Sequence, residues 1–495
     1  MKGAVAAGHP LTAQAGARVL EAGGNAVDAA VAAALVSWVA ESPLTGPGSG
    51  GFMLVHRARD RSNRVFDFFV AVPGLGLPNR ELADMDRVDV DFSGGSSQIF
   101  HIGAASCAVP GAPIGLEDAH RSFGSLPWRE LFQPAIDLAR NGVELNNGQA
   151  YLHGILDLIL RHTPESRAVY EQDGERLVAD DTLVQTDLAG TLELLAEEGG
   201  KVLFEGELAQ KISEHVRAHG GCITQEDLER YRVIRRRPVT ASFCGEEYVS
   251  NPPPSAGGIL IAYGLPLLEE IGPGSPGTAE AMDALARVMR EQAHARIAAR
   301  TVTGGLVHAL EERAAIVSQG TTHISVIDGK GNAVGLTAST GAGSGVVVPG
   351  TGIHLNNMIG EFDLSKTPRP GARLASMMSP SIVLRDGEPH LVVGSAGSLR
   401  LRGAVMQIVV NAVAHDLPVE EALDRPRVHL EGDDLHCEGG HDPAELDRLE
   451  EMGWKVTRWR RRNLYFGGAS AVTLVDGNVA AAGDPRRGGA GVVVE

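Results

Sequence analysis

The chain has 495 residues, of which 43% are hydrophobic, and its 44 Lys and Arg residues against 62 Asp and Glu residues give a formal net charge of −18. This length allows one large domain or two closely packed ones, and the apolar content favours a packed core over a disordered chain. Proteins that bind nucleic acids usually carry an excess of positive charge, whereas this chain is acidic. Anionic membranes would also repel it, so neither a nucleic acid nor a membrane is expected as a partner.

The four cysteines, Cys107, Cys222, Cys244 and Cys437, are far apart and include no CxxC pair. This spacing argues against a zinc site and against a disulfide framework, and no metal or organic cofactor is expected. The first 14 residues lack the long apolar segment of a secretory signal, so the sequence as written predicts a cytoplasmic protein.

The first half of the chain predicts mostly helices. Apolar residues at helical spacing predict a helix over 11–22 that ends at Gly23, after which Asn25 caps a buried helix reaching Ala40. That second apolar run is shorter than the roughly 20 residues of a membrane span. Residues 45–56 predict a glycine loop entering a strand; the loop lacks the GK[ST] ending of a phosphate loop, which favours a tight turn.

Further elements follow in chain order. Helices are expected over 125–141, twice within 187–217, after a proline turn in 250–272, and over 277–317. From Thr321 the apolar period changes to two, which predicts a strand hairpin turning at 329–332, with later strands in 381–394 and 470–482. Helices over 402–415 and 443–452 complete a pattern of sheets enclosed by helical layers.

The stretch "SQGTTHISVID", residues 318–328, places two threonines after a glycine at the start of a predicted strand. Threonine is common in strands, so the pattern alone is weak. A threonine hydroxyl is a poor nucleophile unless a base activates it, and an α-amine on the same residue can be that base. In mid-chain this requires the protein to cut the Gly320–Thr321 bond itself, and Gly320 tolerates the close approach that such a cut needs.

Ten motifs in order connect this stretch with a known family. They are "AAGHPLTAQAGARVLEAGGNAVDAAVAAAL", "GPGSGGFML", "AVPGAPIGLEDAHRSFGSLPWRELFQPAIDLARNGV", "ITQEDLERY", "NPPPSAGGI", "TTHISVIDGKGNAV", "GIHLNNM", "MMSPSIV", "VVGSAGS" and "GDPR". Together they cover nearly the whole chain, and the sequence resembles the γ-glutamyltransferase family of self-processing N-terminal-nucleophile hydrolases.

The resemblance implies an α+β fold in the form of a four-layer αββα sandwich. It implies cleavage before Thr321 into a large subunit, 1–320, and a small subunit, 321–495, that begins with the nucleophile. The two fragments would remain together as a heterodimer, with a dimer of heterodimers as an alternative, and a small molecule would be the substrate.

Catalytic roles are also implied by position. Thr321 is the nucleophile, and Ser339 stands where the family has a threonine that hydrogen-bonds it. Gly397 and Ser398, in "GSAGS", stand where two glycine N–H groups form the oxyanion hole.

The expected substrate pocket departs from the family pattern. Phe69, in "FDFFVAVPG", occupies the place of the arginine that grips the substrate α-carboxylate, a bond that a phenyl ring cannot make. Beside Asn357, Met358 replaces a polar side chain, whereas Glu361 keeps the acid for the substrate amine. Ser376 and Met377 replace a pair of serines. Gly341 falls near the place of an asparagine, and Arg369, Arg373 and Arg400 are candidates for a substitute charge.

These residues predict an intact acyl-transfer centre next to an altered substrate-binding pocket. We expect a self-processing threonine hydrolase or acyltransferase that acts through an acyl-enzyme, on a substrate other than glutathione. The alternatives are a C–C bond-cleaving hydrolase of an antibiotic pathway that makes alkylproline units, a true γ-glutamyl hydrolase or transpeptidase, and a matured but non-catalytic binding protein. The sequence leaves the substrate, the acceptor and the choice between hydrolysis and transfer open.

Overall fold

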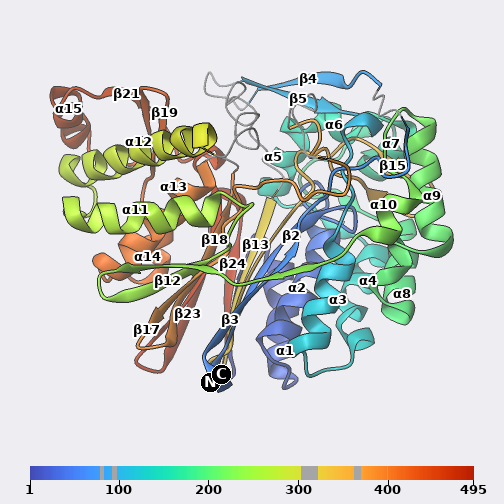
Figure 1. The fold of residues 1–495 in the computed structure, drawn as a ribbon, viewed down its shortest axis with the longest axis horizontal. Helices are drawn as coiled ribbons and strands as arrows, with labels where there is room; N and C mark the ends of the chain where they lie inside the picture. Colours follow the sequence, from blue (N-terminus) through green and yellow to red (C-terminus); the bar gives the residue numbers. More distant parts are fainter. Residues whose placement is uncertain (79–82, 92–96, 303–320, 362–368, 398–399) are drawn as a thin grey trace.

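The computed structural model describes residues 1–78, 83–91, 97–302, 321–361, 369–397 and 400–495. Two antiparallel sheets lie face to face at its centre, and helices cover the outer face of each sheet (Figure 1). The expected four-layer αββα arrangement is therefore confirmed.

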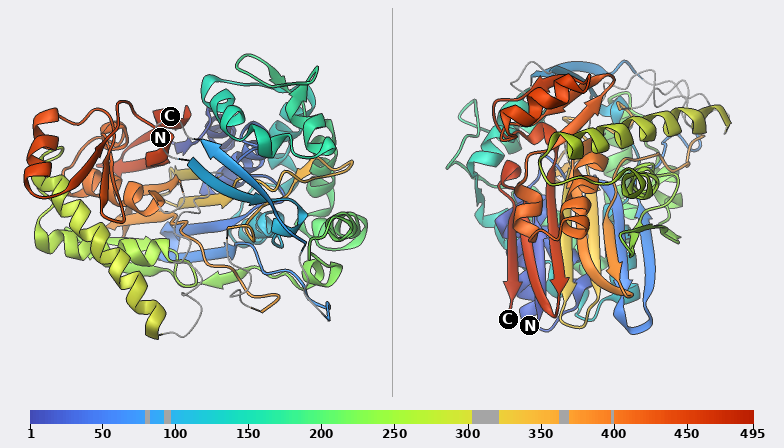
Figure 2. Two further views of the ribbon diagram at one scale, coloured as in Figure 1. Left: turned by 90° about the horizontal axis from the view of Figure 1, so that it is seen from above. Right: turned by 90° about the vertical axis from the view of Figure 1, so that its left-hand side faces the viewer.

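The first sheet has seven strands, and its centre is built from both sides of the predicted cleavage point. In spatial order the strands are β10 (Ile234–Arg236), β3 (Ser62–Phe68), β2 (Gly50–Arg57), β14 (Ala333–Ser339), β13 (Thr321–Asp328), β1 (Gly3–Ala7) and β24 (Ala490–Val494). The predicted hairpin, β13 and β14, thus lies between β2 and β1. The first and last strands of the chain pair with each other, so both termini lie together at one end of the strands (Figure 2).

The second sheet has six strands and packs against the first through β18 and β22, which contact β13. In spatial order its strands are β11 (Val239–Phe243), β12 (Glu246–Ser250), β17 (Ser381–Arg385), β18 (Glu388–Ala396), β22 (Gly468–Val475) and β23 (Asn478–Gly483). Apolar side chains from both sheets, among them Phe52, Leu54, Ile382 and Val392, form the core between them.

Smaller sheets surround this sandwich. They are formed by β4 (Asp86–Asp91) with β5 (Ser97–Ile102), β6 (Val143–Glu144) with β9 (Thr182–Leu183), β7 (Glu171–Gln172) with β8 (Glu175–Arg176), β15 (Val347–Val348) with β16 (Ile353–His354), and β19 (Val428–Glu431) with β20 (Asp434–Cys437) and β21 (Lys455–Arg458).

The helices fall into two groups along the chain. The first group is α1 (Pro10–Glu21), α2 (Ala26–Ala40), α3 (Ala112–Phe123), α4 (Gln133–Asn141), α5 (Asn147–Ile155), α6 (Asp157–Leu160), α7 (Pro164–Tyr170), α8 (Thr186–Glu198), α9 (Gly206–Ala218) and α10 (Gln225–Arg230). The second group is α11 (Gly257–Ile271), α12 (Ala279–Val302), α13 (Leu401–Val409), α14 (Val419–Asp424) and α15 (Pro443–Glu451). In Figure 1 the two groups lie on opposite sides of the sheets.

The predicted elements agree well with the observed ones. The helices expected over 125–141 and 187–217 are present as α4, preceded by a 3-10 turn at Trp128–Leu131, and as α8 and α9. The helix expected over 402–415 ends as α-helix at Val409 and continues as a π-helical turn, Val410–Ala414. The helix expected over 277–317 is confirmed to Val302, and the remainder lies outside the described residues.

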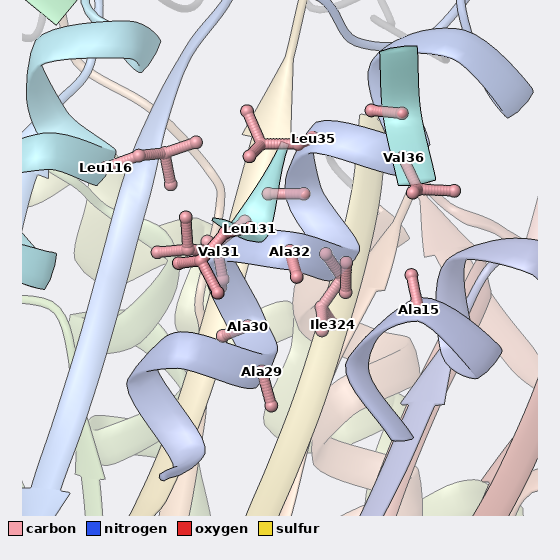
Figure 3. Packing of buried hydrophobic residues seen from close by; sticks show 14 of the residues in the cluster. Ala15, Ala29, Ala30, Val31, Ala32, Leu35, Val36, Leu116, Leu131 and Ile324 are labelled. Atoms are coloured by element: carbon pink, nitrogen blue, oxygen red, sulfur yellow. The ribbon is translucent and has the colours of Figure 1, made fainter. Parts of the chain in front are cut away.

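The helix α2 is the centre of the first helical layer. Every one of its residues is buried, and its small alanine side chains let it approach both Ile324 of β13 and the surrounding helices closely (Figure 3). Asn25 caps it, as predicted, together with Asp28 in a reciprocal capping box. The buried Asp28 carboxylate also accepts hydrogen bonds from the backbone N–H and the hydroxyl of Ser125, which satisfies its charge. In the described parts of the chain no helix combines the length and the apolar character that crossing a membrane requires.

We expect that Gly115→Ala, in α3, destabilises the protein. A Cβ at this position would lie 2.1 Å from Cγ of the buried Phe68, so the helix or the ring must move, which typically costs about 1–3 kcal/mol. The matched control is Gly190→Ala in the helix α8, where a Cβ meets no atom within 4 Å and should stabilise the helix by about 0.5–1 kcal/mol. Thermal unfolding of the three proteins measures both effects, and equal midpoints would contradict the packing described for α3.

Candidate active site

Thr321 begins β13, the strand beside the middle of the first sheet. Its side chain is 2% exposed, and its Oγ1 donates a hydrogen bond to Oγ of Ser339, 3.2 Å away. The register explains the contact, because Thr321 pairs with Ser339, the last residue of β14, and Ser339 pairs with Gly50 of β2. The Ser339 hydroxyl also accepts a hydrogen bond from the N–H of Gly341 at 2.9 Å, which fixes its orientation.

The buried ion pair between Arg487 and Glu41 contacts the backbone at the start of β13. The guanidinium of Arg487 donates to the carbonyl oxygen of Thr321, and its Nη2 lies 3.8 Å from Oε2 of Glu41. Glu41 in turn accepts hydrogen bonds from the hydroxyls of Thr322, at 2.7 Å, and Thr12, at 2.8 Å. These contacts fix the backbone on the C-terminal side of the Thr321 Cα, and the hydrogen bond to Ser339 orients the Thr321 hydroxyl.

The sequence analysis did not identify Glu41 or Arg487. Glu41 lies far from Thr322 along the chain, and only the fold brings them together. Arg487 directly follows the "GDPR" motif, whose own Arg486 forms a separate buried network with Glu438 and Asp484. That motif was therefore the one available signal that the C-terminal segment supports the site.

Gly397 lies at the same end of the sandwich as Thr321. A Cβ on Gly394 of β18 would touch the imidazole of His323, so β18 passes directly over β13, and Gly397 follows just after β18 ends. The φ angle of Gly397 is +125°, a backbone conformation that side chains strongly disfavour, and this explains the glycine. Ser398 lies outside the described residues, and so does Gly320.

Two of the residues predicted to depart from the family pattern meet in one apolar cluster. Phe69 and Met358 are each 2% exposed and pack in the same cluster as Leu374 and Met378. The Phe69 ring also stacks on Phe52, with ring centres 5.5 Å apart and planes 20° from parallel. The position where the resemblance places a substrate-binding arginine is therefore occupied by Phe69, packed among apolar side chains.

Two polar residues of the predicted pocket lie together beside Gly341. A Cβ on Gly341 would lie 2.0 Å from Oδ1 of Asn357 and 2.8 Å from Oε1 of Glu361, so the two side chains converge there. Asn357 accepts a hydrogen bond from the N–H of Ala342 at 2.9 Å, which makes it a support of this loop.

The remaining pair of the predicted pocket residues lies on the loop before β17. The Ser376 hydroxyl accepts from the N–H of Met378 at 3.0 Å, and Met377 is partly buried beside the backbone of Gly257. No contact places the Ser376 hydroxyl or the Met377 side chain against Thr321 among the described residues.

Two of the three arginines considered as substitute charges have other contacts. Arg373 pairs with the buried Asp67, with Nε 3.3 Å from Oδ1, and its guanidinium covers the Tyr231 ring at 4.6 Å. Asp67 also pairs with Arg236 at 2.7 Å. Arg400 is buried with its guanidinium 4.0 Å from the centre of the Tyr465 ring, and burial lowers its pKa. Arg369 is exposed on the surface.

Two buried histidines, His323 near Thr321 and His390 at the far end of β18, are satisfied by neighbouring side chains. His323 contacts the hydroxyls of Thr337, at 2.7 Å, and Ser325, at 3.0 Å, and burial lowers its pKa to about 3. His390 contacts Glu246 at 2.7 Å. Within the described ranges no group of three or more His, Cys, Asp or Glu side chains is arranged to hold a metal ion.

Comparisons with known proteins agree with this geometry. The family model described as gamma-glutamyltranspeptidase matches residues 12–302 and 283–494. The glutathione hydrolase proenzyme of Escherichia coli (strain K12) is 32% identical over 98% of this chain and 90% of its own length. The acylase ACY 1 proenzyme of Pseudomonas sp. (strain SE83) is 33% identical over 100% of this chain and 94% of its own length.

The fold is also that of a solved relative. The crystal structure of a cephalosporin acylase from Bacillus halodurans superposes with a TM-score of 0.82 and 24% identity, covering 100% of this chain and 96% of the other. With the family model matched over nearly its whole length, the chain belongs to the γ-glutamyltranspeptidase family of N-terminal-nucleophile hydrolases and is an enzyme whose relatives are made as proenzymes.

Proposed function

We propose that the chain cuts itself between Gly320 and Thr321, and that Thr321 then serves as the nucleophile of an acylase acting on a substrate other than glutathione. In the first reaction, the Thr321 hydroxyl attacks the Gly320 carbonyl carbon, and the peptide nitrogen leaves as an amine that takes up the hydroxyl proton. Water hydrolyses the ester and leaves a carboxylate on Gly320 and a free amine and hydroxyl on Thr321.

The same hydroxyl then attacks the substrate. The freed α-amine, with an ordinary pKa of about 7.7–8.0, accepts the hydroxyl proton and passes it to the leaving group. An ester between the acyl group and Thr321 forms, and water or an acceptor amine resolves it. The N–H groups of Gly397 and Ser398 would stabilise the oxyanion, a role that typically contributes about 2.7–4 kcal/mol per donor.

The contact between Thr321 and Ser339 supports this assignment. It brings the two hydroxyls predicted from sequence within 3.2 Å, in a buried place where the Arg487–Glu41 pair holds the backbone. A buried hydroxyl held in one direction loses little entropy on attack, which is the usual advantage of a preorganised nucleophile. The names of the relatives, each a proenzyme, agree with a chain that matures by cleavage.

The apolar cluster around Phe69 carries the proposal about the substrate. A free α-carboxylate placed against Phe69 and Met358 would lose its hydration without gaining a positive partner, a loss of several kcal/mol. Arg373 does not replace the missing charge, because its guanidinium is already engaged by Asp67, by the Tyr231 ring and by the carbonyl oxygen of Arg232. An acyl group with an apolar or uncharged end avoids this loss, and one relative is named as an acylase rather than as a glutathione hydrolase.

A γ-glutamyl substrate is the second candidate. Glu361 remains beside Gly341 and Asn357, where an acid can hold a substrate ammonium group, and one relative is named as a glutathione hydrolase. The two candidates differ in the charge that the site must accept, so substrates of the two kinds distinguish them.

The variant Thr321→Ala tests self-cleavage. Because it lacks the attacking hydroxyl, we expect it to remain a single chain of 495 residues without activity, whereas the wild type yields a fragment that begins Thr-Thr-His. Intact-mass spectrometry and N-terminal sequencing measure both results. The matched control Thr322→Ala should still mature, since its hydroxyl contacts Glu41 rather than Ser339. A cleaved Thr321→Ala protein would exclude Thr321 as the processing nucleophile.

The hydrogen bond from Thr321 to Ser339 predicts a second effect. In matured enzyme, Ser339→Ala should lower kcat about tenfold with little change in KM, because the contact orients the nucleophile and does not bind substrate. Ser339→Thr keeps the hydroxyl and should recover most of the rate. Steady-state kinetics on matured protein decide this, and an unchanged kcat in Ser339→Ala would remove Ser339 from the mechanism.

Restoring a charge tests the substrate class. The double variant Phe69→Arg with Met358→Gln should raise kcat/KM for a γ-glutamyl anilide about tenfold or more, and should lower it for an anilide with an apolar acyl group. Phe69→Leu with Met358→Gln is the control, because it changes size without adding charge. Brisk wild-type hydrolysis of glutathione would contradict the proposed substrate class while leaving the role of Thr321 intact.

A further inference from the structure

An arginine-lined groove opens at the far end of the first sheet. It has a volume of about 670 Å³ and lies between the adjoining ends of β2 and β3, the strand β10 and the C-terminal end of α3. Arg57, Arg64, Arg121 and Arg235 line it together with Phe66 and Phe123. Four cationic side chains in one groove are unusual for a protein with a net charge of −18.

Two phenylalanine rings lie beneath the arginines, the fully buried Phe66 and the partly buried Phe123. Phe66 and Phe123 meet edge to face with ring centres 5.7 Å apart. The guanidinium of Arg57 lies over Phe123 at 5.2 Å, and that of Arg235 lies over Phe66 at 5.6 Å. A guanidinium that stacks on a ring keeps its N–H groups at its edge, where they can bind a phosphate or carboxylate.

The charges in the groove are only partly compensated. Arg57 pairs with Asp60, Nε to Oδ1 at 2.8 Å, and Arg235 pairs with Asp118, Nη2 to Oδ1 at 2.6 Å.

The other two arginines give the groove its excess charge. The side chains of Arg64 and Arg121 are exposed, and within the described ranges neither has a hydrogen bond or an ion pair. The groove therefore carries two positive charges more than these pairs neutralise, and they attract anions even though the molecule as a whole repels them.

The groove is separate from the active site. Gly50 pairs with Ser339 at one end of β2, and Arg57 pairs with Ser62 at the other end. Seven residues of extended chain separate the two ends, a distance of about 23 Å at roughly 3.3 Å per residue. A molecule bound in the groove would not contact Thr321.

We propose that this groove is a binding site for a small polyanion that carries phosphate or carboxylate groups. Its volume falls within the range of small-molecule sites, and its concave shape, with two aromatic rings beneath the arginines, suits a compact ligand. The stacked pair, Arg57 and Arg235, is already oriented by Asp60 and Asp118, so binding loses little side-chain entropy there. Arg64 and Arg121 supply the free donors.

Isothermal titration of the wild-type protein with pyrophosphate and, separately, with citrate tests this proposal at fixed ionic strength. We expect saturable binding of at least one of these anions. The anion that binds more tightly shows whether the groove prefers phosphate or carboxylate groups. The double variant Arg64→Ser with Arg121→Ser should lose at least about tenfold in affinity. It should keep its maturation and its hydrolytic rate.

The matched control is Arg460→Ser with Arg461→Ser, two exposed arginines outside the groove, which changes the net charge equally and should leave the affinity unchanged. An equal loss of affinity in the two double variants would show that only the net charge of the protein matters, and it would overturn the proposal. The absence of saturable binding by either anion would also overturn it. Light scattering tests the alternative that the groove binds an acidic surface of another protein copy. An oligomer that dissociates only in the groove variant, with anion binding intact, would assign the groove to an acidic protein surface and also overturn the proposal.

Discussion

The pairing of Thr321 with Ser339 across β13 and β14 is the contact on which the rest of the site depends. A hairpin normally fixes only the register of its own two strands. Here the register is fixed on both sides, by β2 next to β14 and by β1 next to β13. Because α2 packs directly on this sheet through small side chains, the hairpin cannot slip without opening the core. Thr321, the proposed nucleophile, thus begins a strand in which every residue is buried.

The same rigidity sets limits on the substrate. The residues around Phe69 belong to the core between the two sheets, where Phe69 and Met358 are each 2% exposed. A charged end group would lose its hydration against these apolar side chains without gaining a positive partner, whereas an apolar end group has no such loss. The proposed catalytic hydroxyls and the proposed determinants of specificity therefore come from two different parts of the structure: the hydroxyls from the hairpin, and the determinants of specificity from the core beside it.

The sequence predicts most of the fold because its signals are local. The cap at Asn25, the change of period at Thr321 and the end of the helix at residue 141 each depend on neighbours within a few residues, and each is found as expected. The nucleophile and Ser339 were identified through motifs.

The supporting contacts could not be predicted in this way. Glu41 meets Thr322 across 281 residues, and Asp67 meets Arg373 across 306 residues, so only the folded chain brings their charges together. Arg373 illustrates the consequence, because by sequence it is a candidate to bind substrate, whereas the fold pairs it with a buried carboxylate.

The most direct measurement is to locate the acyl group in a trapped acyl-enzyme. Matured protein is mixed briefly with an activated acyl donor, quenched in acid, digested and mapped by mass spectrometry. The account predicts that the added acyl mass lies on the first residue of a peptide beginning at Thr321, whose α-amine was already free before digestion. An acyl group on any other residue, or a modified peptide in which Gly320 is still bonded to Thr321, would contradict it.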